Sequence, residues 1–387
     1  MIETAAKLLD VKTDELSAFV KYDPYNPTNL VDGFICRRSD HRYGALVIVK
    51  INDWECQQII YATPKLHYPF DKVGTYKWPD CQQIEYYTKL DGTNILAYRY
   101  EYKNDVCLSY KTRLTPFLQD QTFGMFGSMW NEYTSSHPEI LDVIYANPRH
   151  NLSFELYGSR NPITILYDEP LCVKLLFGVE REYGSVCPPS LLYHSEGLIP
   201  ECYTMDGDHN DLTARYNRYR EHMSLRNKDS LTIEGMVMYA DIGEPSWMMF
   251  KCKPEEIEKI HLAASGSIPR LALFNTAMNT FESSDAPLIR DFLELLKEEY
   301  PENLITKSML KIEKIWKEAL DHAEFVKQVN DVWILAKKEG LDVTKDKNET
   351  MRFMARHFDK NIMRRVGSVI LKQVGRDRNS IGRVAAL

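Results

Sequence analysis

The sequence predicts an α+β fold, in which a body of short strands and a few helices is followed by an all-helical C-terminal domain. Two observations predict it. Apolar residues between positions 84 and 253 mostly alternate with polar ones or form short continuous runs, as in strands. After Lys253-Pro254 the apolar period changes to that of a helix. The length of 387 residues suits two or three domains.

The first part of the chain combines an expected helix with expected strands. We expect helix over about the first 20 residues, because apolar residues recur there at helical spacing and Thr13 can cap a turn leading to Leu16, Phe19 and Val20. A proline-rich stretch follows at 23–27. Segments 44–50 and 56–62 are rich in β-branched residues and bounded by turn formers, which predicts strands.

The middle of the chain is expected to be mostly strands, and the end to be helices. Strands are predicted at 84–88, 94–102, 106–111, 152–157, 171–179, 233–238 and 250–253, with a hairpin connection around Gly243. Apolar helical faces follow at 289–296, 310–320 and 325–335. We therefore place one unit at 1–254, with its core at about 60–254, and a helical domain at 255–387.

A short motif at the end of one predicted strand carries the chemistry. Lys89 is followed by Asp91, Gly92 and Asn94 in the string KLDGTN. Lysine becomes a nucleophile when burial or neighbouring cations favour its neutral amine. Asp91 can orient that amine or a nucleotide hydroxyl, and Gly92 lets the backbone turn close to a ligand. Taken alone, such a string is more often a surface turn.

Carboxylates and lysines recur in later strands. Glu155 and Glu234 each interrupt an apolar strand, and a buried carboxylate needs a cation, a metal or donors. Lys251 and Lys253 share one face of the last strand. Pairing of the last two strands should bring Glu234 within reach of both lysines. Together with Lys89, these groups fit attack of a lysine on the α-phosphate of a nucleoside triphosphate, with cations and a carboxylate-bound metal neutralising the phosphates.

These motifs resemble those of the ATP-dependent RNA ligases, a group of covalent nucleotidyltransferases, and most of all the phage RNA ligase 1 branch. The resemblance covers about half of the chain and implies a nucleotidyltransferase (ATP-grasp-like ligase) core of antiparallel sheets. Lys89 matches the nucleotidyl-lysine and Asn94 the RNA ligase form of its motif. Glu155 matches a ribose-contacting glutamate, and Glu234 a metal-binding or catalytic one. Asp91 and Gly92 match nucleotide-binding positions of the same motif, and Phe177 matches an adenine-stacking position. Lys251 and Lys253 match the paired phosphate-binding lysines.

Three further segments bear on this resemblance. Lys65, in the string PKLHY, is similar to a triphosphate contact of the ligase 1 branch, and Arg113 to an arginine that contacts substrate phosphate; a surface strand arginine is an equal alternative for Arg113. Segment 161–167 also resembles that branch, although Pro162 stands where an arginine is usual.

The resemblance implies a three-step reaction with ATP as substrate and Mg²⁺ as cofactor. Lys89 would take AMP from ATP, the AMP would pass to an RNA 5′-phosphate, and an RNA 3′-hydroxyl would displace it to seal the strand, in RNA or tRNA repair. DNA ligases and capping enzymes are the enzymatic alternatives. They usually add a domain with an R-x-D-K element, and the nearest string here, at 356–360, has one residue too many. A non-catalytic RNA-binding protein with a ligase-like core is the alternative of another class.

Charge and hydropathy bear on partners and location. The net charge is −7, yet positions 351–387 hold nine Lys and Arg against two Asp. This basic tail suits an arm that binds RNA phosphates, and a solvated helix face is an equal alternative. No apolar run approaches 18 residues, so we expect no membrane contact and a cytoplasmic protein.

Overall fold

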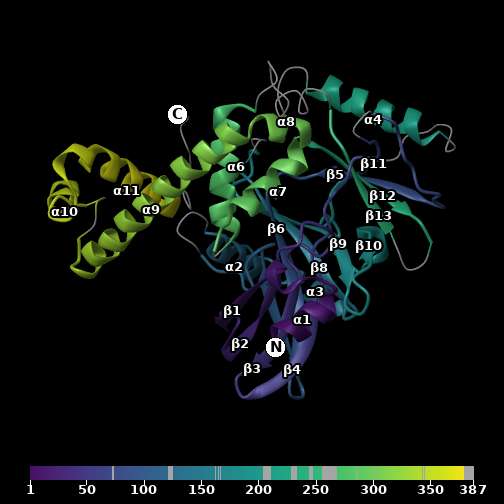
Figure 1. Cartoon of the computed structure of the whole chain (residues 1–387), viewed down its shortest axis with the longest axis horizontal. Helices are drawn as coiled ribbons and strands as arrows, with labels where there is room; N and C mark the ends of the chain where they lie inside the picture. The colour runs from purple at the N-terminus through teal and green to yellow at the C-terminus, as the bar shows by residue number, and fades with distance from the viewer. Residues whose placement is uncertain are drawn as a thin grey trace.

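The structure, a computed structural model, describes 1–71, 74–120, 125–161, 163, 165, 167–203, 211–227, 233–243, 247–254, 268–284, 286–300, 302–341, 343 and 345–378. Figure 1 shows the strands on one side of the molecule and a long helix, α9, leading away from them to α10 and α11. Pro162 and the end of the basic tail, 379–387, lie outside the described residues.

Three antiparallel sheets form the body, as the sequence predicts. The first has the order β1-β2-β3-β4. The second has the order β10-β9-β8-β6-β7 and the third β11-β5-β12-β13. The strand bounds are β1 Leu16–Asp23, β2 Asn26–Cys36, β3 Leu46–Ile51, β4 Trp54–Ile60, β5 Ile84–Lys89, β6 Thr93–Tyr102, β7 Asp105–Lys111, β8 His150–Tyr157, β9 Cys172–Glu180, β10 Val186–Cys187, β11 Cys202–Tyr203, β12 Gly235–Asp241 and β13 Trp247–Cys252.

The helical prediction for the first 20 residues is wrong beyond residue 9. Helix α1 spans Ile2–Leu9, and Leu16–Asp23 is strand β1. Its residues alternate between more and less buried, and β1 pairs with β2 from Leu16↔Cys36 to Tyr22↔Leu30. The spacing of Leu16, Phe19 and Val20 resembles a helix, but the partner strand, which the sequence did not predict, satisfies the backbone of this segment.

The inner faces of the second and third sheets share one apolar core. Tyr87 of β5, Tyr239 of β12 and Met249 of β13 belong to the same cluster as Leu96 of β6 and Phe177 of β9. The outer faces are covered by helices. α2 (Phe126–Ser136) and α3 (Glu139–Ala146) pack on the second sheet, and α4 (Leu212–Arg226) packs on the third. The candidate site therefore lies where two sheets face each other.

The described elements after residue 268 are helices, in addition to one short 3₁₀ turn. The helices are α6 Arg270–Ser283, α7 Ile289–Glu299, α8 Glu302–Lys307, α9 Met309–Lys338, α10 Lys347–Met354 and α11 Met363–Arg378. They form two apolar clusters, one around α6, α7 and the first half of α9, the other around the second half of α9, α10 and α11. Among the described residues, no helix is both long and apolar enough to cross a membrane.

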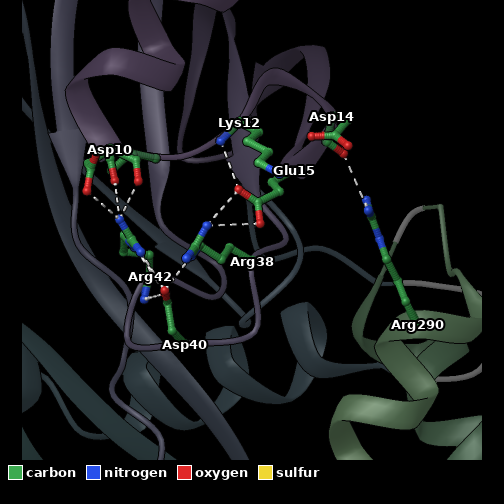
Figure 2. A network of polar contacts seen from close by, with 9 residues as sticks. Asp10, Lys12, Asp14, Glu15, Arg38, Asp40, Arg42 and Arg290 are labelled. Carbon is green, nitrogen blue, oxygen red and sulfur yellow. Dashed lines mark hydrogen bonds and ion pairs between the residues drawn. The ribbon is translucent and has the colours of Figure 1, made fainter.

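Helix α7 is attached to the first sheet by charged groups. Arg37, directly after β2, forms an ion pair with Asp291, and both side chains are almost completely buried. Tyr43 donates a hydrogen bond to the same carboxylate at 3.0 Å. Figure 2 shows the neighbouring surface network, in which Arg290 reaches the backbone carbonyl of Asp14 at 3.4 Å. Helix α7 is thus attached to the first sheet at the loop between β2 and β3.

Candidate active site

Lys89 and Lys253 lie on either side of one carboxylate. Lys89 Nζ donates a hydrogen bond to Glu234 Oε2, and Lys253 Nζ lies 3.0 Å from Glu234 Oε1. Glu234 and Lys253 are buried, with side-chain exposures of 5% and 1%, whereas Lys89 is 20% exposed. The arrangement therefore joins a buried pair to a lysine that solvent or a ligand can still reach.

The strand register produces this contact. β12 pairs with β5 so that Gly235 lies opposite Lys89, and with β13 so that Met236 lies opposite Cys252. Glu234, one residue before β12, thereby lies next to the ends of both neighbouring strands. A Cβ on Gly235 would lie 2.6 Å from the carbonyl oxygen of Cys252, so the close approach of these strands requires glycine.

A cavity of about 180 Å³ opens beside Lys89, between the second and third sheets. Its walls include six of the residues that the sequence singles out, namely Lys89, Asn94, Arg113, Glu155, Phe177 and Lys251. Leu176, Val237, Tyr239 and Met249 supply an apolar part of the wall. An apolar cavity with a few converging polar groups is the usual form of a small-molecule site.

Glu155 is the buried carboxyl group of the cavity wall. It lies in β8 opposite Asn94 of β6, and its residue exposure is 8%. Burial raises the pKa of Glu155 to about 8, although the nearby Lys89 opposes this increase. The carboxyl group is therefore mostly protonated at neutral pH and can donate a hydrogen bond as well as accept one.

The residues after Lys89 fix the turn beneath the cavity. Asp91 accepts a hydrogen bond from the backbone N–H of Ile165 at 2.7 Å, and its own N–H donates to Tyr167 Oη at 2.9 Å. A Cβ on Gly92 would lie 2.3 Å from the carbonyl oxygen of Leu156, which only glycine avoids. The described part of segment 161–167 thus supports the Lys89 turn.

Asn94 points its amide along the sheet. Asn94 Nδ2 donates to Ser153 Oγ at 2.7 Å and to the carbonyl oxygen of Phe154 at 3.3 Å. These bonds hold the side chain against β8, in the wall of the cavity.

Three predicted phosphate-contacting residues meet helix α7. Arg113 Nη1 lies 2.6 Å from Glu298 Oε1, and Lys65 Nζ lies 3.7 Å from the same oxygen. Lys65 Nζ is also 3.2 Å from Glu294 Oε2. Lys251 Nζ donates to the carbonyl oxygen of Glu298 and stands over the Tyr68 ring, 4.5 Å from its centroid. The structure therefore gathers these cations around Glu298, and Arg113, Lys251 and Glu298 themselves line the cavity.

The position of Lys251 has a simple cause. Lys251 lies within β13 opposite Val237, whereas Lys253 follows two residues later, directly after the strand ends at Cys252. Two residues of a strand span about 6.6 Å. The two lysines share a face as predicted, but Lys253 contacts Glu234, whereas Lys251 reaches α7.

Sequence reasoning missed Glu294, Glu298 and Lys111. Lys111, at the end of β7, donates to the carbonyl oxygens of Gly44, Thr112 and Arg113 at 2.8–3.0 Å. Complete burial, with a contribution from Arg113, lowers the pKa of Lys111 to about 7. The available signal for Lys111 was a charged residue at the end of a strand that is apolar apart from Asp105 and Ser109. Nothing local marks the two glutamates, because their role depends on where α7 packs.

No family model matches the chain, and no curated protein matches it. Among solved structures, an archaeal ATP-dependent RNA ligase (form 1) aligns with 11% identity and a TM-score of 0.41, over 92% of this chain and 89% of that one. A putative ATP-dependent DNA ligase from Aquifex aeolicus aligns with 12% identity and a TM-score of 0.41, over 93% and 89%. A mutant Naegleria gruberi RNA ligase with AMP and Mn aligns with 10% identity and a TM-score of 0.30, over 63% and 98%. The similarity to these ligases is distant.

Proposed function

We propose that this protein is an ATP-dependent RNA ligase that works through a lysyl-AMP intermediate on Lys89. The observation that carries the proposal is the contact of Lys89 with Glu234, itself paired with Lys253, at the edge of a cavity that also contains Glu155 and Phe177. A nucleophilic amine, a carboxylate and an apolar wall for a base are the groups that adenylyl transfer needs.

The first step joins Lys89 to AMP. Lys89 Nζ attacks the α-phosphorus of ATP, a P–N bond forms, and the bond to pyrophosphate breaks. The amine has to lose a proton, and Glu234 Oε2 already accepts a hydrogen bond from it. Phe177 and its apolar neighbours would hold adenine, and Glu155 would hold a ribose hydroxyl with its mostly protonated carboxyl group.

The cations gathered around Glu298 would hold the phosphates. Lys65, Arg113 and Lys251 are gathered there by their contacts with α7. Charge neutralisation favours phosphoryl transfer, because negative charge on the departing pyrophosphate is stabilised. The adenylyl group would then pass to an RNA 5′-phosphate, and a 3′-hydroxyl would displace AMP and seal the strand.

Mg²⁺ fits the donor set around Lys89. The ion is usually held by one or two carboxylates together with substrate phosphates, and Glu234 supplies one such carboxylate. Within the described ranges, no group of three or more His, Cys, Asp or Glu side chains is arranged to hold a metal by itself. When bound, Mg²⁺ would neutralise phosphate charge during each transfer.

RNA is the proposed acceptor, and the proposed units are an adenylyltransferase part at 1–254 and a helical part at 255–387. Basic residues occur in α10, in α11 and in the turn between them, among them Arg352, Lys360 and Arg364. Figure 1 shows α10 and α11 at the end of α9, on the other side of the molecule from β5. A basic surface held away from the Lys89 site suits contact with the remote part of an RNA chain.

The test is labelling of the protein with ATP. The protein is incubated with magnesium and with each α-labelled nucleoside triphosphate, and covalent label is detected after denaturation. We expect label from ATP that is absent in Lys89→Ala. No adduct with any nucleotide would contradict the proposal. Adding 5′-phosphorylated RNA or DNA then distinguishes an RNA ligase from a DNA ligase, and a labelled protein that seals neither would point to a capping-type acceptor.

A further inference from the structure

Helix α7 presents two carboxylates to the cations that would hold the triphosphate. Glu294 and Glu298 together contact Lys65, and Glu298 also contacts Arg113. These side chains are only 11–29% exposed, so solvent screens their attraction incompletely. The backbone carbonyl of Glu298 accepts the hydrogen bond from Lys251. Each cation that we assign to the phosphates is therefore already engaged by α7.

These carboxylates are held in place by the rest of α7. Asp291, Glu294 and Glu298 recur at i, i+3 and i+7, which puts them on one face of the helix. Asp291 anchors that face in the first sheet through the buried pair with Arg37. Phe292 belongs to the apolar cluster of the C-terminal helices. The helix is thus fixed on two sides, so that Glu298 lines the cavity and Glu294 contacts Lys65 as part of the fold.

The contacts create a competition. The β- and γ-phosphates of ATP, or free pyrophosphate, would need the same ammonium and guanidinium groups that the carboxylates occupy. The α-phosphate of AMP would depend on groups nearer Lys89. The carboxylates therefore oppose binding of the two outer phosphates selectively, with little effect on binding of the nucleoside.

We propose that the carboxylates of Glu294 and Glu298 are built-in counter-anions of a pyrophosphate subsite formed by Lys65, Arg113 and Lys251. The outer phosphates of ATP have to displace these carboxylates, and the carboxylates contact the cations again once pyrophosphate has left. The inference rests on the proposed function and concerns regulation of the same site. These residues form and break no covalent bond. Their effect is to weaken ATP binding and to oppose the reverse attack of pyrophosphate on lysyl-AMP.

The experiment compares nucleotide affinities of the full-length protein. Glu294→Gln, Glu298→Gln and the double variant keep side-chain size and remove charge. Affinities for ATP, inorganic pyrophosphate and AMP are measured by calorimetry, in the Lys89→Ala background so that no adduct forms. Glu313→Gln, an exposed position of α9, is the matched control. Thermal unfolding verifies that each variant is folded. If the double variant does not fold, the affinities of the two single variants are compared with those of the parent protein.

We expect ATP and pyrophosphate to bind about five- to tenfold more tightly to the double variant, the effect of losing the three partly exposed ion pairs that Glu294 and Glu298 form with Lys65 and Arg113. Affinity for AMP should stay within about twofold, and the control should match the parent protein. Unchanged or weaker ATP and pyrophosphate binding would overturn the inference, as would equal tightening for AMP.

The failure of the two proposals can be distinguished. If the protein with Lys89 labels with ATP but its glutamine variants do not bind ATP and pyrophosphate selectively more tightly, the ligase proposal stands and the counter-anion proposal is wrong. A protein that never labels removes the ligase proposal, while pyrophosphate affinity still decides whether α7 competes for the cations.

Discussion

Replacing Glu234 with alanine should destabilise the protein, because two lysines would lose the carboxylate between them. Lys253 is 1% exposed and Glu234 5%, so the pair is desolvated. Removing one partner of a buried ion pair costs about 3–5 kcal/mol. Lys89 is 20% exposed and can be solvated in part, so we assign most of the loss to Lys253. We expect a decrease of about 3 kcal/mol in the free energy of unfolding.

A second substitution tests this reasoning. Lys253→Met removes the buried cation that loses its ion pair in Glu234→Ala. The double variant should therefore be more stable than the sum of the single losses predicts, by about 1.5–3 kcal/mol. Formation of the ATP adduct should remain absent in Glu234→Ala and in the double variant, because restoring stability does not restore the carboxylate beside Lys89.

The assay is urea denaturation of the parent protein, both single variants and the double variant, with label from ATP measured on the same samples. Additive losses, with a coupling close to zero, would refute the claim that Lys253 depends on Glu234 in the fold. Recovery of labelling in the double variant would refute the role of Glu234 in the chemistry.

Three further predictions concern other parts of the structure. Because the pKa of Glu155 is raised from 4.5 to about 8, its neutral form favours folding below pH 4.5, and this contribution is lost as pH rises to about 8. Glu155→Gln should reduce the slope of unfolding free energy against pH by up to about 1.4 kcal/mol per unit in that window, and an unchanged slope would show that Glu155 is ionised. Gly92→Ala should cost about 1–3 kcal/mol in urea denaturation, because its Cβ would lie 2.3 Å from a carbonyl oxygen; a neutral effect would contradict this packing. Asp291→Asn should lower the free energy of unfolding by about 3–5 kcal/mol, because buried Arg37 would lose its carboxylate partner. A variant that unfolds at the same temperature as the parent protein would contradict the anchoring of α7.

The strands around the site were predictable because their signal is local. Residues 94–102 alternate in polarity and form β6, and the apolar run at 171–179 lies within β9 apart from its first residue. Lys251 of β13 and Lys253 directly after it share a face because successive side chains of an extended chain point in opposite directions. The contact of Lys253 with Glu234 then needed only the hairpin pairing of β12 with β13.

The remaining features depend on contacts between distant segments. Strand β1 has apolar residues at a spacing that also suits a helix, and its pairing with β2 determines the outcome. Glu294 and Glu298 look like the solvated face of an amphipathic helix in the sequence. Only the packing of α7 against the first sheet brings them to Lys65 and Arg113.

In the proposed reaction, Lys89 carries the adenylyl group. The most direct measurement is peptide mapping by mass spectrometry after incubation with ATP and magnesium. We expect one adenylylated lysine, in the peptide that contains Lys89, and its loss on addition of pyrophosphate. An adenylyl group on Lys65, Lys251 or Lys253, or no modified peptide, would contradict it.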